Sequence, residues 1–166
     1  MKIFLIGMPG SGKSTLGRPL AQALNLPFVD LDKEIERQEQ QTIPDIFASH
    51  GEDHFRNVES SALKQWAFSS KDFVLATGGG APCFHSGIDI INQHGLSIFL
   101  DVTVDELLRR IGVQSGRPLL GTDDLKQKEE KLAQLYAKRR DIYLQAKITL
   151  VEPTLAQLME AIYLKK

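Results

Sequence analysis

The stretch GMPGSGKST, residues 7–15, constrains this chain more than any other part of its sequence. It fits the pattern G-x-x-x-x-G-K-[ST] and lies between a short apolar run, residues 2–6, and a stretch with helical spacing, residues 13–24. Such glycines let backbone N–H groups converge on phosphate oxygens at the start of a helix. In this pattern Lys13 reaches the β and γ phosphates, and the Ser14 hydroxyl ligates Mg²⁺. The sequence therefore predicts a strand, a phosphate-binding loop and a helix that together hold a nucleoside triphosphate.

The rest of the chain alternates short β-rich runs with helical patterns. The β-rich runs are residues 27–32, 73–77, 96–101 and 148–151. Such alternation predicts a parallel sheet covered by helices on both faces. No repeat or flexible linker divides the chain, so we expect residues 1–166 to form a single domain. Three glycines and a proline between two helical patterns indicate a mobile surface loop at residues 112–124.

Composition limits the partners that this chain can have. Its 20 Lys and Arg nearly balance its 21 Asp and Glu, and the net charge of −1 gives no general attraction to nucleic acid or to an acidic membrane. No apolar stretch approaches the ~20 residues that span a bilayer, and the run before Gly7 is too short for a signal peptide. Cys83 is alone, so no intrachain disulfide can form. We therefore expect a cytoplasmic protein.

Two acids, Asp30 and Asp32, stand at the end of the second β-rich run, where ligands bind in open α/β sheets. Their spacing places them on one face of a strand, so one could serve Mg²⁺ and the other the substrate. Asp32 could instead cap a helix that begins at Lys33. Asp101, which closes the fourth apolar run, is a rival metal ligand.

Two arginines lie within helical patterns. Arg56 has Glu52 and Glu59 at helical spacing, so it could form an ordinary surface ion pair or contact a substrate. Arg139 falls inside the apolar stripe of residues 132–146 and is expected to point inward. Because a buried guanidinium without a partner is costly, an anion must meet Arg139, either a protein carboxylate or an anionic substrate.

The sequence TGGG, residues 77–80, directly follows the third β-rich run. Its glycines would let a ligand approach the backbone closely, although a tight turn would use the same residues. Arg117 lies in the glycine-rich loop, where a closing lid would bring its charge onto the triphosphate. Arg117 could also be a solvated surface residue. Acids and arginines of this kind are the parts that phosphoryl transfer requires.

Six motifs occur in this chain in the order and approximate spacing seen in shikimate kinases, which the chain resembles from Ile3 to about Ile162. They are GMPGSGKST, FVDLD, GEDHFR, TGGG, GRPLL and KRRDIY. The resemblance implies a three-layer α/β/α fold with a five-stranded parallel sheet, P-loop NTPase topology and a mobile lid at about residues 112–122. It also implies ATP-dependent phosphorylation of the 3-hydroxyl of shikimate, with Mg²⁺ as cofactor.

The resemblance further implies a role for each matching residue on the nucleotide side. The ATP phosphates would be wrapped by Gly10, Ser11, Gly12, Lys13, Ser14 and Thr15. Ser14 and Asp30 would serve Mg²⁺, whereas Arg110 and Pro153 would contact adenine. Arg117 would be the lid cation and, like Lys13, a catalytic residue.

On the acceptor side, the resemblance implies that Asp32 hydrogen-bonds the ring hydroxyls of shikimate. Asp32 would also take the proton from the attacking hydroxyl, as the third catalytic residue. Arg56 and Arg139 would grip the shikimate carboxylate. The ring would lie against three glycines: Gly78, Gly79 and Gly80.

Two other functions fit the same sequence. A kinase of similar architecture could act on another small metabolite, such as gluconate, or on a nucleoside monophosphate. The short interval between Asp32 and Arg56 leaves little room for an insert that recognises a second base. A nucleotide-dependent binding or regulatory protein would keep the loop without turnover, but it would not need Asp32 and the arginines. We expect a monomer whose partners are ATP and shikimate.

Overall fold

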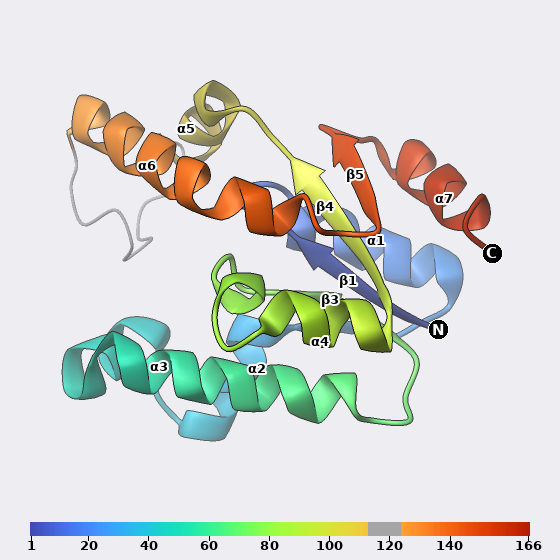
Figure 1. Ribbon diagram of the computed structural model, residues 1–166, viewed down its shortest axis with the longest axis horizontal. Helices are drawn as coiled ribbons and strands as arrows, with labels where there is room; N and C mark the ends of the chain where they lie inside the picture. The colour runs from blue at the N-terminus through green and yellow to red at the C-terminus, as the bar shows by residue number, and fades with distance from the viewer. Residues whose placement is uncertain (113–123) are drawn as a thin grey trace.

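The computed structural model describes residues 1–112 and 124–166, which form a layered α/β structure (Figure 1). Within these residues a five-stranded parallel sheet has the order β2-β3-β1-β4-β5. The strands are β1 (Lys2–Ile6), β2 (Phe28–Asp30), β3 (Phe73–Ala76), β4 (Leu96–Asp101) and β5 (Ile148–Val151). The prediction of an all-parallel sheet is therefore confirmed.

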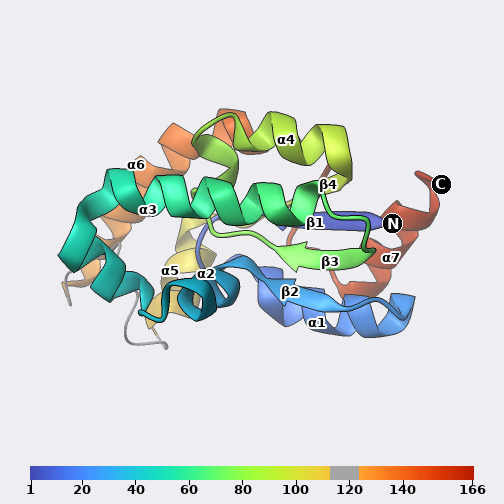
Figure 2. The ribbon, with the colours of Figure 1, turned by 90° about the horizontal axis from the view of Figure 1, so that it is seen from below.

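Helices cover both faces of the sheet, as the alternating pattern predicts. They are α1 (Lys13–Leu24), α2 (Leu31–Glu39), α3 (Ile43–Ala67), α4 (Gly87–His94), α5 (Val104–Gly112), α6 (Leu125–Tyr143) and α7 (Leu155–Tyr163), with a 3₁₀ turn, η1 (Ala81–Cys83). Figure 2 shows α1 and α7 on one face of the sheet and α3, α4 and α6 on the other. The predicted three-layer α/β/α arrangement is confirmed.

The core has two parts because successive side chains of β1 point to opposite faces of the sheet. Phe4 and Ile6 join the cluster under α3, α4 and α6, whereas Ile3 and Leu5 join the cluster under α1 and α7. All four side chains are fully buried. A strand covered on both faces reads as a continuous apolar run, which explains the pattern before the phosphate-binding loop.

The junction of β2 and α2 differs from the prediction. β2 pairs with β3 only as far as Asp30, and α2 begins at Leu31, so Asp32 lies in the first turn of a helix rather than on a strand. The alternative, that Asp32 caps a helix, is also wrong. The cap is Asp30, whose carboxylate accepts a hydrogen bond of 3.3 Å from the Lys33 backbone N–H. Asp30 caps the helix because the first helical N–H groups have no partner inside the helix, and the extended backbone of Asp30 suits a cap.

Helix α3 is broken at Gly51, whose φ of 83° and ψ of 176° interrupt the helix. Glycine adopts a positive φ without the cost that a Cβ would add. The segment before the break carries Ile43 and Phe47 toward the carboxyl edge of the sheet, and the segment after it carries Arg56.

The predicted lid at residues 112–122 lies outside the described residues except for Gly112, the last residue of α5, and Arg117 lies outside them as well. In the part of the chain that the structure describes, no helix combines the length and apolar character needed to span a membrane.

Candidate active site

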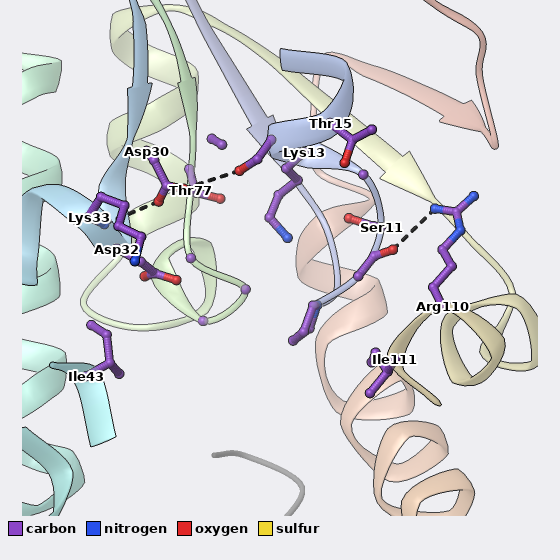
Figure 3. A pocket seen from close by; sticks show the side chains of 18 of the residues that line it. Ser11, Lys13, Thr15, Asp30, Asp32, Lys33, Ile43, Thr77, Arg110 and Ile111 are labelled. Carbon is purple, nitrogen blue, oxygen red and sulfur yellow. Dashed lines mark hydrogen bonds between the residues drawn. The ribbon is translucent and has the colours of Figure 1, made fainter. Parts of the chain in front are cut away.

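A cavity of about 1200 Å³ opens at the carboxyl edge of the sheet (Figure 3). The predicted residues that line it are Gly10, Ser11, Gly12, Lys13, Ser14, Thr15, Asp30, Asp32, Arg56, Gly78, Gly79, Gly80, Arg110 and Pro153. Arg139 does not line the cavity but lies directly behind the glycines. The structure therefore brings together the predicted site residues that it describes.

The phosphate-binding loop forms one wall of the cavity. Gly10 and Gly12 have φ values of 83° and 94°, so this loop needs glycine at both positions. The Lys13 ammonium donates hydrogen bonds of 2.8 Å to the carbonyl oxygens of Gly7 and Met8, which keep its charge at the loop. The loop leads directly into α1, whose N-terminus adds a partial positive charge for an anion.

Ser14 and Asp30, the predicted metal ligands, contact each other. The Ser14 hydroxyl donates to Oδ2 of Asp30 over 3.3 Å, and the Asp30 side chain lies beside the loop in Figure 3. The described residues hold no cluster of three or more His, Cys, Asp or Glu that could bind a metal ion. One carboxylate and one hydroxyl suit Mg²⁺, which keeps water ligands and is shared with substrate phosphates.

Asp101, the rival metal ligand, is engaged elsewhere. It accepts a hydrogen bond of 2.8 Å from the Tyr136 hydroxyl, and it is not among the residues that line the cavity. The geometry therefore favours Asp30 as the acid beside the metal.

Arg56 is buried inside an ion-pair network rather than exposed on a helix surface. Its Nη1 donates to Glu59 Oε1 over 2.8 Å, and its Nη2 donates to Glu52 Oε1 over 3.4 Å. The expected glutamate partners are thus present, but the Arg56 side chain is only 4% exposed, so the surface alternative is wrong. The Nε of Arg56 is buried without a hydrogen-bond partner among the described residues.

Arg139 points inward from α6, as the apolar stripe predicts. It is 5% exposed, and its Nη1 has no hydrogen-bond partner in the described part of the chain. The same residues provide no carboxylate that forms an ion pair with it. Of the two anions that the sequence left open, this geometry favours a ligand.

Both guanidinium groups lie against the glycines that follow β3. A Cβ on Gly79 would lie 2.9 Å from Nη1 of Arg139, and a Cβ on Gly80 would lie 2.1 Å from Nη1 of Arg56. A Cβ on Gly78 would likewise lie 2.8 Å from Oδ1 of Asp32. These glycines therefore leave the space that the two arginines and Asp32 occupy, and they bring the three side chains to one short segment.

The two buried arginines differ in their partners. Glu59 is buried with Arg56 and Arg139, and burial raises the pKa of its carboxyl although both arginines oppose that rise. Glu59 forms an ion pair with Arg56, whereas Nη1 of Arg139 has no hydrogen-bond acceptor among the described residues. A bound anion would supply that acceptor, because buried charges are stable only when they are paired and hydrogen-bonded.

Arg110 and Pro153 line the cavity on the other side of the phosphate-binding loop. Nη1 of Arg110 donates to the Gly10 carbonyl over 3.2 Å (Figure 3). Its Nε donates to Glu106 over 2.9 Å. Hydrogen bonds from Arg109 and Arg110 lower the pKa of Glu106 to about 2. Arg110 is therefore fixed at the mouth of the nucleotide side.

Sequence reasoning missed one side chain that holds the glycine segment in place. The Tyr143 hydroxyl donates to the Gly79 carbonyl over 2.6 Å, and this tyrosine is fully buried against Phe99. Its position one turn after Arg139 was visible in the sequence, but its partner was not. Helix α6 therefore delivers both a cation and a positioning hydroxyl to the segment.

A phosphate-binding loop after the central strand of a parallel sheet, with a cavity beside it, defines a P-loop NTPase fold. The same cavity is lined by the buried Arg56, whose guanidinium suits a small anionic molecule. A family model described as "Shikimate kinase" matches residues 9–163. The chain belongs to the shikimate kinase family.

Individual relatives agree with this assignment. The chain is 40% identical over 163 residues to a shikimate kinase of Clostridium botulinum, which covers 97% of this chain and 94% of that protein. It is 43% identical over 148 residues to a shikimate kinase of Rhodopseudomonas palustris, covering 89% and 71% respectively. A solved structure of the Acinetobacter baumannii shikimate kinase in complex with shikimate superposes with a TM-score of 0.92 and 34% identity, covering 99% of this chain and 94% of that one.

Proposed function

We propose that this protein transfers the γ-phosphoryl group of ATP to the 3-hydroxyl of shikimate, giving ADP and shikimate 3-phosphate. Membership in the shikimate kinase family supports this activity. The observation that carries it is the pair of buried arginines, Arg56 and Arg139, which lie beside Asp32 and have unmet hydrogen-bonding capacity. A carboxylate on the acceptor would supply the missing anion and would fix the ring through charge-assisted hydrogen bonds.

The catalytic roles follow from this placement. With the carboxylate held by both arginines, the ring would lie against Gly79, and its 3-hydroxyl would face Asp32. Asp32 would accept the proton of that hydroxyl as its oxygen attacks the γ-phosphorus in line, and ADP would leave. Lys13 and the loop N–H groups would stabilise the charge on the phosphate oxygens. Positioning does most of the work, since phosphoryl transfer needs little covalent help from protein.

Ser14 and Asp30 would hold Mg²⁺, which neutralises phosphate charge when bound. We also propose Arg117 as the cation of a lid at residues 112–122, and Arg110 and Pro153 as adenine contacts. A single domain, a monomeric state and a cytoplasmic location remain our predictions, and size-exclusion chromatography with light scattering tests the second.

Acceptor-dependent release of ADP tests the proposal. Purified protein with ATP and Mg²⁺ should release ADP rapidly when shikimate is added, and much more slowly with gluconate or a nucleoside monophosphate. The Asp32→Asn variant should lose transfer but retain ATP binding, measured by calorimetry. Indifference to shikimate, or a preference for gluconate, would overturn the proposed acceptor. Substantial turnover in Asp32→Asn would remove Asp32 from its role as proton acceptor.

A further inference from the structure

The ring of Phe84 covers the guanidinium of Arg56. Its centroid lies 4.1 Å from Cζ of Arg56, whereas the ring of Phe55, a neighbour on the same helix, is 5.2 Å away. A guanidinium at this distance over an aromatic face is attracted by the negative charge of the ring face. Phe84 comes from a separate segment, between η1 and α4, so the contact joins two parts of the fold.

Phe84 confines this guanidinium together with the Gly80 backbone and the glutamates Glu52 and Glu59. A Cβ on Gly80 would lie 2.1 Å from Nη1, 2.6 Å from Cζ and 2.9 Å from Nη2 of Arg56, so the whole group lies against the Gly80 backbone. Glu59 fixes Nη1 over 2.8 Å. A salt bridge alone leaves a long side chain free to rotate about the contact, whereas a backbone, a carboxylate and a ring together leave one orientation.

A strained turn places the Phe84 ring. The Gly87 N–H donates to the Phe84 carbonyl over 2.9 Å, and the two residues between them, His85 and Ser86, have φ values of 49° and 58°. Consecutive non-glycine residues with positive φ are costly and persist only where the surroundings impose them. Here Gly87 packs so closely on η1 that a Cβ would lie 1.9 Å from the Ala81 carbonyl oxygen. The turn thus returns the chain onto η1, which packs against α3. Figure 2 shows the neighbouring helix α4 beside α3.

We propose that Phe84 is a positioning residue, which holds the Arg56 guanidinium in the orientation that binds the acceptor carboxylate. This inference rests on the proposed function, because it concerns the arginine assigned to the acceptor. Phe84 is 36% exposed, so it contributes less to the core than a buried phenylalanine does. Its removal should therefore alter acceptor binding more than folding.

Three variants test the proposal by steady-state kinetics. Phe84→Leu keeps an apolar cover without an aromatic face, and the KM for shikimate should rise roughly 5- to 30-fold, the range expected for loss of one cation–π contact. The KM for ATP and the melting temperature should stay near those of the wild type. Phe84→Tyr, which restores the face, should restore the KM for shikimate. Phe68→Leu is the matched control, because Phe68 is 64% exposed and contacts His94 instead of Arg56.

A second measurement needs no acceptor. In ¹⁵N-labelled protein, the Nε–H signal of Arg56, assigned with Arg56→Lys, should move downfield in Phe84→Leu as the ring current is lost, and should stay in place in Phe68→Leu. An unmoved signal together with an unchanged KM for shikimate would overturn the role of Phe84. Equal rises of both KM values with a lower melting temperature would also overturn it, since the ring would then only support the fold. A wild-type protein that ignores shikimate would refute the proposed function instead, and the NMR comparison would still decide whether Phe84 holds Arg56.

Discussion

Alanine in place of Gly80 should displace Arg56 without straining the backbone. Gly80 has φ −86° and ψ −17°, a conformation that alanine adopts readily. The new Cβ, however, would lie 2.1 Å from Nη1 and 2.6 Å from Cζ of Arg56. Since unbonded carbon and nitrogen atoms separate to about 3.5 Å, the guanidinium has to withdraw by roughly 1 Å or more.

This displacement sets the size of the effect. A shift of about 1 Å in a positioning group can cost about 100-fold in rate. We therefore expect the kcat/KM for shikimate to fall about 100-fold in Gly80→Ala, with the KM for ATP unchanged. The protein should still fold, because the atoms that the new Cβ meets lie at the end of the Arg56 side chain and not in the backbone.

Coupled ADP release at varied shikimate and ATP concentrations, together with thermal denaturation, measures both effects. Gly51→Ala is the complementary variant: no atom lies within 4 Å of the added Cβ, but the φ of 83° strains alanine. Because φ 83° with ψ 176° is a conformation that essentially only glycine adopts, it should lose about 1–3 kcal/mol of stability and keep the wild-type KM for shikimate. A wild-type kcat/KM for shikimate in a folded Gly80→Ala protein would refute the argument that the arginine is confined against this glycine.

Three further changes have defined outcomes. Tyr143→Phe removes the hydrogen bond to Gly79, so it should lower stability by about 1–3 kcal/mol in chemical denaturation and raise the KM for shikimate rather than for ATP. Asp30→Asn should leave the melting temperature almost unchanged, because asparagine caps helices as well as aspartate does, yet a titration of activity should require more Mg²⁺. Burial raises the pKa of Glu59 above its ordinary 4.5, so its proton binds more tightly in the folded state. Its contribution to the free energy of unfolding is therefore full below pH 4.5 and is lost as the pH rises through the raised pKa, and Glu59→Gln should abolish this part of the pH dependence in urea titrations.

A local pattern predicted the phosphate-binding loop, whose residues line the cavity. The phosphate-binding loop depends on backbone conformations and on side chains that are adjacent in the chain, so the sequence alone places Lys13 and Ser14. The inward direction of Arg139 was also predictable, because helical spacing decides which residues of α6 face the core.

The acceptor side depends on contacts that no local pattern contains. Asp32 was expected on a strand, but the sheet ladder ends at Asp30, and pairing with a distant strand determines that end. The fit of Gly80 to Arg56 joins the segment after β3 to α3, and the hydrogen bond from Tyr143 joins α6 to the same segment. These contacts join residues that are far apart in the chain, so only the folded structure reveals them.

The two arginines that we propose for the acceptor come from α3 and α6, which lie far apart in the chain, whereas the phosphate-binding loop is complete between β1 and α1. A bound acceptor would therefore act as a cross-link between two helices, and amide hydrogen exchange in α6 should slow when it is added. A nascent chain still lacking α6 would carry the phosphate-binding loop without Arg139, so an acceptor could be held by both arginines only after α6 has been synthesised.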